Sequence, residues 1–190
     1  GSFVWAKNIG GSSFESARRI ITDASNNIYL AGMYTGIVDF DPSAATYTLS
    51  SNSSSTDGFI LKLDPSGNFI WVNGIGGVGT DICASIALDV SNNLYATGSY
   101  SATVDFDPSA ATYNLNSSGD YDIFILKLTD NGALEWVKTI GSVQNDNGQR
   151  ALLQNDQSVI ISGVFSENIN FGDSLNPMIL SSQGKRDIFV

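Results

Sequence analysis

The sequence has 190 residues and a mass of 20.2 kDa, which suits a single core or an array of small repeated units. Apolar residues make up 42% of it and charged residues 15%, which excludes an intrinsically disordered chain. Acidic residues outnumber basic ones 19 to 9, and the net charge of -10 disfavours nucleic acid and anionic membranes as partners. The absence of His excludes histidine-based nucleophile pairs and the commonest zinc ligand.

Two further features set the context of the chain. Its one cysteine, Cys83, lies between Ile82 and Ala84, which indicates a core side chain and not a reactive thiol. No apolar run approaches the roughly 18 residues that a transmembrane helix needs, so membrane insertion is not expected. Gly1-Ser2 resembles a cloning remnant, so we expect any export signal or neighbouring domain to lie outside this chain.

Three copies of one sequence pattern fill the chain. A segment that contains a tryptophan and then Ile-Gly opens each copy, and the tryptophans lie 66 and 65 residues apart. These segments are Phe3–Gly11, Phe69–Gly77 and Leu134–Gly141. Self-similarity at a fixed period is the sequence signature of a repeat architecture. We therefore interpret the chain as one repeat domain with units at residues 3–67, 68–132 and 133–190.

The apolar runs within each unit predict β-strands. They are short, rich in β-branched and aromatic residues, and separated by turn residues, which favours strands over helices. Turns rich in Asp, Asn and Gly join the first strand to the second and the third to the fourth. In the middle unit we expect four strands, at Ala84–Leu88, Leu94–Tyr100, Ile123–Leu128 and Leu134–Ile140.

A long excursion of about 20 residues separates the second strand of each unit from the third. It opens with Val38–Tyr47 in the first unit and returns almost letter for letter as Val104–Tyr113. In the third unit it decays to Ile169–Asp173. Because Pro42 and Pro108 cannot donate to a sheet ladder, we expect an edge or loop segment here.

The third strand of each unit carries charged residues that suggest structural roles. Lys62 and Lys127 alternate with apolar residues, so we expect them to cover an exposed strand face. Asp57, Asp122 and Asp187 stand just before these strands. We expect these carboxylates to fasten loops by accepting hydrogen bonds from backbone amides.

Four antiparallel strands that recur at a fixed period predict an all-β fold of propeller blades, three to a chain. A stacked solenoid is the competing architecture. Solenoid coils usually run to 20–45 residues and favour Leu/Asn or Gly/Asp ladders, which this chain does not show, so the propeller is favoured.

The repeat resembles the bacterial β-propeller repeat abbreviated SBBP. The pattern that carries the resemblance is Asp-x-Phe-Ile-x-Lys-Leu-Asp-x-x-Gly-x-x-x-Trp, then Ile-Gly-Gly, then Asp-x-x-x-Asn-x-Tyr-x-x-Gly. It is strong over Asp57–Gly77 and Asp89–Gly98 and weaker in the third unit. The resemblance implies a blade of an exported bacterial protein, secreted or on the cell surface, and implies neither a shared ligand nor an activity.

The phase of the repeat predicts how the chain assembles. The chain begins with an outer strand, Phe3–Ile9, and ends with a third strand, Asp187–Val190, so its last blade lacks an outer strand. Three blades are fewer than the normal minimum of about four for a ring. We expect a homodimer in which the first strand of each copy completes the last blade of the other, so that the two copies form a six-bladed ring. The alternatives are that the chain is a piece of a longer propeller or forms a strand-swapped ring of another size. The assembly residues are Phe3, Val4, Trp5, Ile9, Ile188, Phe189 and Val190.

The excursions also carry the candidate binding residues. Carboxylates two positions apart occur in the first excursion, Asp39 and Asp41, and in the second, Asp105 and Asp107, while the third keeps only Asp173. Together with backbone carbonyls, such pairs could hold Ca²⁺, which takes 6–8 oxygen ligands. The same residues fit a turn in which the first Asp accepts backbone amides and the following phenylalanine plugs the blade, and we favour the turn. Calcium is the only cofactor that the sequence leaves open.

Taken together, the sequence predicts a non-catalytic scaffold or binding module that mediates protein interaction or self-assembly. A lectin-like module that binds glycans, with or without calcium, is the alternative, because Trp5, Trp71 and Trp136 could stack on sugars. Their strand-like surroundings favour blade packing instead. A polysaccharide-cleaving enzyme is the least favoured reading, since no pair of acids on distinct loops stands out.

Overall fold

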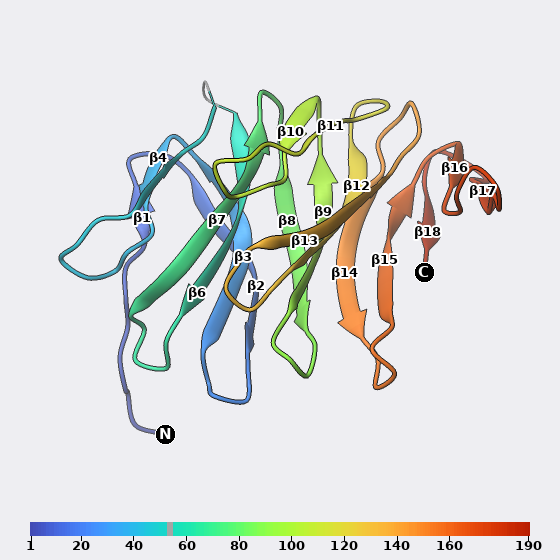
Figure 1. Cartoon of the computed structure of the whole chain (residues 1–190). Helices are drawn as coiled ribbons and strands as arrows, with labels where there is room; N and C mark the ends of the chain where they lie inside the picture. The colour runs from blue at the N-terminus through green and yellow to red at the C-terminus, as the bar shows by residue number, and fades with distance from the viewer. Residues whose placement is uncertain (53–54) are drawn as a thin grey trace.

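The computed structural model describes residues 1–52 and 55–190, and this part of the chain contains β-strands and no helix (Figure 1). None of the described residues therefore belongs to a helix long and apolar enough to cross a membrane. Three antiparallel sheets, which we name sheets 1, 2 and 3, stand side by side in the order of the sequence. Sheets 1 and 2 each take three strands from one repeat unit and a fourth, outer strand from the start of the next unit.

Sheets 1 and 2 each contain four long strands in simple meander order, and two short strands of the second excursion extend the outer edge of sheet 1. Sheet 1 consists of β2 (Glu15–Thr22), β3 (Ile28–Thr35), β6 (Thr56–Leu63) and β7 (Phe69–Gly77). Sheet 2 consists of β8 (Ile82–Leu88), β9 (Leu94–Tyr100), β12 (Asp122–Leu128) and β13 (Leu134–Ile140). The four strands expected in the middle unit are confirmed, two of them at the expected bounds.

Sheet 3 contains three strands within the described chain. They are β14 (Asn147–Leu153), β15 (Val159–Phe165) and β18 (Asp187–Phe189). The last of these is the third strand expected at the end of the sequence, and it forms the edge of its sheet.

The excursions form two-stranded hairpins. They are β4 (Ile37–Asp39) with β5 (Thr48–Ser50), β10 (Thr103–Asp105) with β11 (Asn114–Asn116), and β16 (Asn168–Asn170) with β17 (Ile179–Ser181). Pro42 and Pro108 lie outside the strands, in agreement with the expected edge position.

Each of the first two hairpins holds the end of the preceding outer strand. Asp105 of β10 pairs with Gly76 at the end of β7, and Val104 pairs with Gly77. A Cβ atom at Gly77 would collide with the carbonyl oxygen of Thr103, so this close approach requires glycine. The hairpin β4–β5 holds the two-residue strand β1 (Gly10–Gly11) in the same register.

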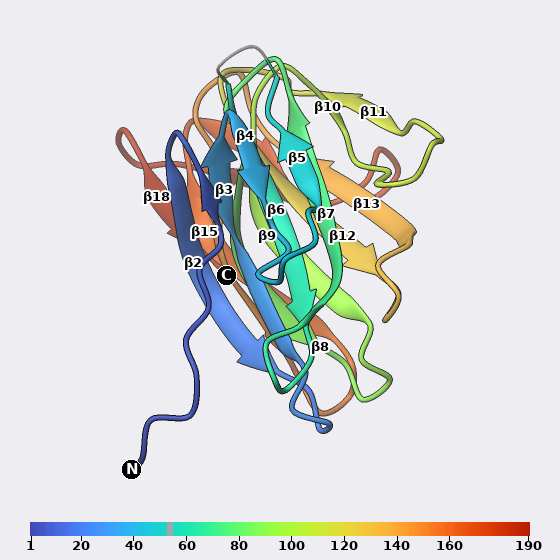
Figure 2. The same cartoon turned by 90° about the vertical axis from the view of Figure 1, so that its left-hand side faces the viewer.

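The expected outer strand over Phe3–Ile9 is wrong for this chain alone. These residues are exposed or half-buried and belong to no sheet. A β-strand needs a neighbouring strand for its hydrogen bonds, and no strand among the described residues pairs with this segment. Figure 2 looks onto the side of sheet 1 that no other described sheet covers, where the N-terminal segment forms a coil outside the sheet.

The core lies between the sheets. Tyr29 and Ile60 of sheet 1 belong to one buried cluster with Ile86 and Leu126 of sheet 2. Cys83 belongs to the same cluster and is fully buried, as the sequence predicts. A second buried cluster joins sheets 2 and 3. Burial of these apolar surfaces between neighbours is the main favourable contribution to stability in a repeat protein.

The expected exposure of the two lysines is wrong. The side chain of Lys62 is only 6% exposed, and its Nζ lies 2.6 Å from Asp130 Oδ1 of sheet 2 and 5.0 Å from the centre of the Tyr29 ring. Lys127 is likewise mostly buried, beside Glu135 and the Tyr95 ring. Alternation along a strand indicates which face a side chain occupies, but here the next sheet covers that face of sheet 1.

Candidate functional site

The carboxylates that open the excursions organise turns. Asp39 Oδ1 accepts hydrogen bonds from the backbone amides of Asp41 and Tyr47, at 3.0 and 2.9 Å. Asp105 accepts the equivalent pair from Asp107 and Tyr113, at 3.0 and 2.8 Å. The turn that we favoured from the sequence is therefore confirmed in the first two units.

The third unit builds the same turn with an amide. Asn170 Oδ1 accepts the backbone amides of Gly172 and Met178, at 3.0 and 2.9 Å. The phenylalanines that follow the first carboxylate in the other two units, Phe40 and Phe106, are 1% and 2% exposed and fill the sheets as expected. Asn thus replaces Asp here without loss of the two hydrogen bonds that form the turn.

The second carboxylates of the excursions are half-buried or exposed and accept hydrogen bonds from local amides. Asp41 and Asp107 each accept the backbone amide two residues ahead, and Asp173 accepts those of Leu175 and Asn176. Hydrogen bonds from Ser109 lower the pKa of Asp107, and the amide of Asn176 lowers that of Asp173. Within residues 1–52 and 55–190, no three His, Cys, Asp or Glu side chains gather as they would around a metal ion.

A second set of carboxylates fastens the sheet junctions. Asp81, before β8, accepts the amides of Gly77 and Ser101 at 3.0 and 3.1 Å. Asp146 repeats this arrangement before β14, with the amides of Ser142 and Ser166. These buried acids tie the end of an outer strand to the start of the next sheet.

Their neighbours at the start of the third strands are also buried. Asp57 accepts a hydrogen bond from Ser55 Oγ at 2.8 Å, and Asp122 accepts the Ser118 amide at 2.9 Å. Burial raises the pKa of Asp57 to about 6. Burial, with the charge of Asp57, raises that of Asp81 to about 7. The predicted acceptance of backbone amides is confirmed for Asp122, and for Asp187, which accepts the Gln183 amide at 2.8 Å, whereas Asp57 binds its loop through the Ser55 hydroxyl.

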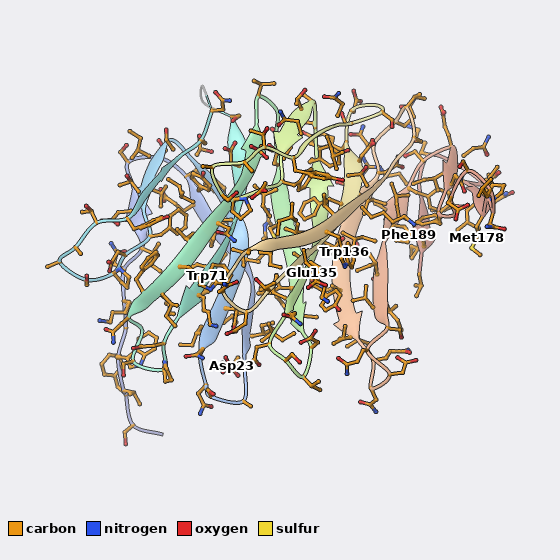
Figure 3. The ribbon with its side chains drawn as sticks, viewed as in Figure 1. Asp23, Trp71, Glu135, Trp136, Met178 and Phe189 are labelled. Atoms are coloured by element: carbon orange, nitrogen blue, oxygen red, sulfur yellow. The ribbon has the colours of Figure 1, made fainter. Side chains whose placement is uncertain are left out.

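The tryptophans pack against neighbouring parts of the fold. Trp71 lies edge-on to Tyr29, and its Nε1 donates to the Asp130 carbonyl at 3.2 Å. Trp136 lies edge-on to Tyr95. Figure 3 shows Trp71 and Trp136 at corresponding places on the outer strands of sheets 1 and 2. The packing role favoured from the sequence is confirmed for Trp71, whereas Trp136 contacts Tyr95 but remains 39% exposed.

The innermost strands of the three sheets share a feature that the sequence does not reveal. Each contains an irregularity of register at the same position, between Ala17 and Arg19 in β2, between Cys83 and Ser85 in β8, and between Gly148 and Arg150 in β14. A bulge of this kind redirects a side chain and is common beside binding sites. The bulged residues are Arg18, Ala84 and Gln149.

These three bulged residues line a shared hollow of about 500 Å³. Arg18 and Arg150 line it from β2 and β14, and the small side chain of Ala84 lies on the strand between them. Ser99 and Asn147 add polar groups to the lining, while no Asp or Glu contributes to it. The hollow is therefore a basic site in an otherwise acidic molecule.

The arginines of this hollow have no anionic partner among the residues that the structure describes. The ion pairs found there, Lys62–Asp130 and Lys127–Glu135, both involve lysine. Arg18 instead contacts Met33 Sδ at 3.8 Å, and Arg150 donates to its neighbour's carbonyl. A guanidinium group binds a carboxylate, phosphate or sulfate with two parallel hydrogen bonds, so this pair can hold an anionic group. The sequence signal for it was slight: Arg18, Arg19 and Arg150 are three of only four arginines.

Comparison with known proteins agrees with a propeller-like repeat. The sequence matches no protein-family model. It is 24% identical over 191 residues to an uncharacterized WD repeat-containing protein of Acanthamoeba polyphaga mimivirus. The alignment covers 88% of this chain, which spans 13% of the relative's length. WD repeats form four-stranded propeller blades. Together with the three sheets, this similarity supports a repeat fold of the β-propeller type, whereas the SBBP type of repeat is not confirmed.

Proposed function

We propose that this chain is a non-catalytic propeller module that binds proteins, and that the hollow on its innermost strands receives an acidic side chain of the partner. The observation that carries the proposal is the pair Arg18 and Arg150, which line one concave surface and have no carboxylate partner among the described residues. A protein-binding scaffold also fits the similarity to a WD repeat protein.

A single carboxylate fits this surface better than a polyanion. The guanidinium groups supply paired donors, and Ser99 and Asn147 supply further polar contacts. The net charge of -10 repels nucleic acid or a polyphosphate at long range. An Asp or Glu on an otherwise neutral or basic partner segment avoids this repulsion and keeps the local ion pairs.

The setting of the module is part of the proposal. The resemblance to the SBBP repeat favours a bacterial protein that is secreted or displayed on the cell surface. Calcium-assisted glycan binding is the weaker alternative, because Trp71 packs edge-on against Tyr29 and donates a hydrogen bond to Asp130, while Trp136, 39% exposed, packs edge-on against Tyr95. If Ca²⁺ binds, Asp39 and Asp41 are the expected ligands, since both line a small polar hollow with Asn8.

We also expect each sheet to act as one propeller blade. Three blades are fewer than a ring normally needs, and we expect a second copy of the chain to supply the other three.

The acidic-group proposal can be tested with two peptides and NMR spectroscopy. The ¹⁵N-labelled chain is titrated with acetyl-Gly-Glu-Gly-amide and with the uncharged acetyl-Gly-Gln-Gly-amide. We expect the Glu peptide alone to shift the amide signals of Gly148, Gln149 and Ser99. Shifts that are equal for both peptides, or confined to another surface, would contradict the proposal.

Substitution separates a specific site from general charge. The double variant Arg18→Ala/Arg150→Ala loses charge-assisted hydrogen bonds and should weaken binding of the Glu peptide about tenfold or more. The control, Lys138→Ala/Lys185→Ala, removes the same charge from exposed positions outside the hollow and should leave the affinity within about twofold. Equal losses in the two double variants would show that only net charge matters.

A further inference from the structure

The N-terminal segment is held against sheet 1 in the way that the outer strand of sheet 1 is held against sheet 2. Trp5 Nε1 donates to the Pro65 carbonyl at 3.3 Å, as Trp71 Nε1 does to Asp130 at 3.2 Å. A Cβ at Gly67 would lie 3.1 Å from the Trp5 ring, so the ring rests on this turn. The segment thus occupies the place of an outer strand relative to sheet 1, although no described strand pairs with residues 3–9.

The hairpin contacts repeat this equivalence. Gly10 pairs with Asp39 as Gly76 pairs with Asp105, and Gly11 pairs with Val38 as Gly77 pairs with Val104. Two independent contacts, one at each end of the segment, therefore place it as the outer strand of a preceding blade.

The matching vacancy lies at the other end of the molecule. Strand β18 pairs with β15 on one side, and no described strand pairs with its other edge. In sheets 1 and 2 the equivalent edges are covered by β7 and β13. Ile188 of β18 is 79% exposed, whereas its equivalent in sheet 2, Ile123, is 0% exposed.

The two outer faces of the array are also complementary. Ile20 of sheet 1 is 62% exposed, although its equivalents Ile86 and Ala151 are 0% and 7% exposed within the sheet junctions. Leu152 of sheet 3 is 62% exposed, although its equivalents pack against the following sheet. Each end therefore presents one half of the interface that joins the sheets within the chain.

An apolar hollow on sheet 1 marks the same incomplete interface. It is lined in part by Leu30, Phe40, Phe59 and Leu61. The equivalent residues of sheet 2 are fully or almost fully buried in the junction with sheet 1; they are Ala96, Phe106, Phe124 and Leu126. The hollow is the surface that a preceding sheet would fill.

We propose that two copies of this chain close a six-bladed ring, with the Phe3–Ile9 segment of each copy as the fourth strand of sheet 3 in the other. This inference rests on the proposed propeller architecture and does not depend on the arginine hollow. The N-terminal segment and β18 lie at opposite ends of the array (Figure 1), so one copy does not join them within itself. A two-fold ring joins both pairs of ends and leaves no open sheet edge.

The internal repeats also define the register. In sheet 1, Ile75 pairs with Gly58 and Gly74 with Phe59. Ile9 and Asn8 are the repeat equivalents of Ile75 and Gly74, and Ile188 and Phe189 are those of Gly58 and Phe59. We therefore expect Ile9 to pair with Ile188, and Asn8 with Phe189, of the second copy.

Disulfide trapping tests this register directly. The variant Ile9→Cys/Ile188→Cys places thiols at a predicted cross-strand pair, where Cα atoms lie about 4.5–5.5 Å apart, within disulfide range. We expect oxidation to give a covalent two-chain species that reductant releases. The control, Ala6→Cys/Ile188→Cys, is three residues out of register and should cross-link at least tenfold less. Equal trapping in both variants, or none in either, would overturn the proposed pairing.

Mass in solution tests the number of copies. Light scattering on the unmodified chain should give about twice 20.2 kDa, and removal of residues 3–9 should abolish that species. A monomer, or a stable assembly of another size, would overturn the two-copy ring. A dimer that does not bind the Glu peptide would contradict the arginine site but not the ring. A monomer that binds the peptide would contradict the ring but not the arginine site.

Discussion

The junction between sheets 1 and 2 differs from the junction between sheets 2 and 3 in its polar contacts. In the first, Lys62, Trp71 and Asn73 all reach across to the turn at Asp130 and Gly132. In the second, the equivalent Trp136 is 39% exposed, and Lys127 turns back to Glu135 of its own sheet. Both junctions keep an apolar core. Apolar burial therefore suffices to stack two sheets, while the polar contacts depend on the turn that follows the third strand.

The largest expected effect is a loss of stability when a phenylalanine is removed from the apolar core of either junction, and its size should differ between the two. Phe124 is 0% exposed in the first junction, and its equivalent in the second, Phe189, is 6% exposed on the short edge strand β18. Phe124→Ala should lower the free energy of unfolding by about 3–5 kcal/mol, the usual cost of emptying such a site. We expect a smaller loss for Phe189→Ala because an edge strand relaxes more easily.

Chemical denaturation of both variants checks this comparison. The slope with denaturant should stay unchanged, so that the midpoint reports stability. A loss for Phe189→Ala that equals or exceeds that for Phe124→Ala would show that sheet 3 is as tightly held as sheet 2.

An intermediate effect is expected where hairpins hold the outer strands. Gly77→Ala would drive a methyl group into the Thr103 carbonyl, within a β7 strand fixed by its sheet. The cost should be about 1–3 kcal/mol, as for other overpacked sites. Gly11→Ala meets the Ile37 carbonyl in the same way, but β1 has only two residues and pairs with β4 alone, so it can move away more easily than β7. We therefore expect Gly11→Ala to leave the unfolding free energy of a single copy within about 0.5 kcal/mol.

Thermal melts of the two alanine variants measure this difference. They should be run at a concentration low enough to dissociate any dimer, since self-association adds to apparent stability. Equal destabilisation by both substitutions would mean that the N-terminal segment is held as firmly as β7.

Much of this architecture can be predicted from the sequence, because the three repeat units allow equivalent residues to be compared with one another. The strand bounds in the middle unit and the turns at Asp39 and Asp105 follow from local patterns, and the structure agrees with both. The position of Lys62 does not follow, because the covering sheet is a tertiary feature. The hollow at Arg18 is equally hidden, since a bulge arises from the mismatch between two paired strands and has no local sequence signature.

The smallest expected effect concerns the acids at the first junction. Burial raises the pKa of Asp57 to about 6 and that of Asp81 to about 7 in the folded chain, above the ordinary value of 3.8. The folded state then binds more protons than the unfolded state between about pH 4 and pH 7, so stability falls as the pH rises through this range. The acids whose pKa is lowered, Asp107 and Asp173 among them, act in the opposite direction and at lower pH.

Asp57→Asn isolates this contribution, because an amide keeps the acceptor for Ser55 and carries no charge. Unfolding free energies between pH 5 and pH 7.5 should decline less steeply for this variant than for the unmodified chain. Asp41→Asn, at an exposed turn, serves as the control and should leave the slope unchanged. If the unmodified chain gains stability over this range, or if Asp57→Asn follows it in parallel, Asp57 is ionised in the folded state and the junction tolerates its charge.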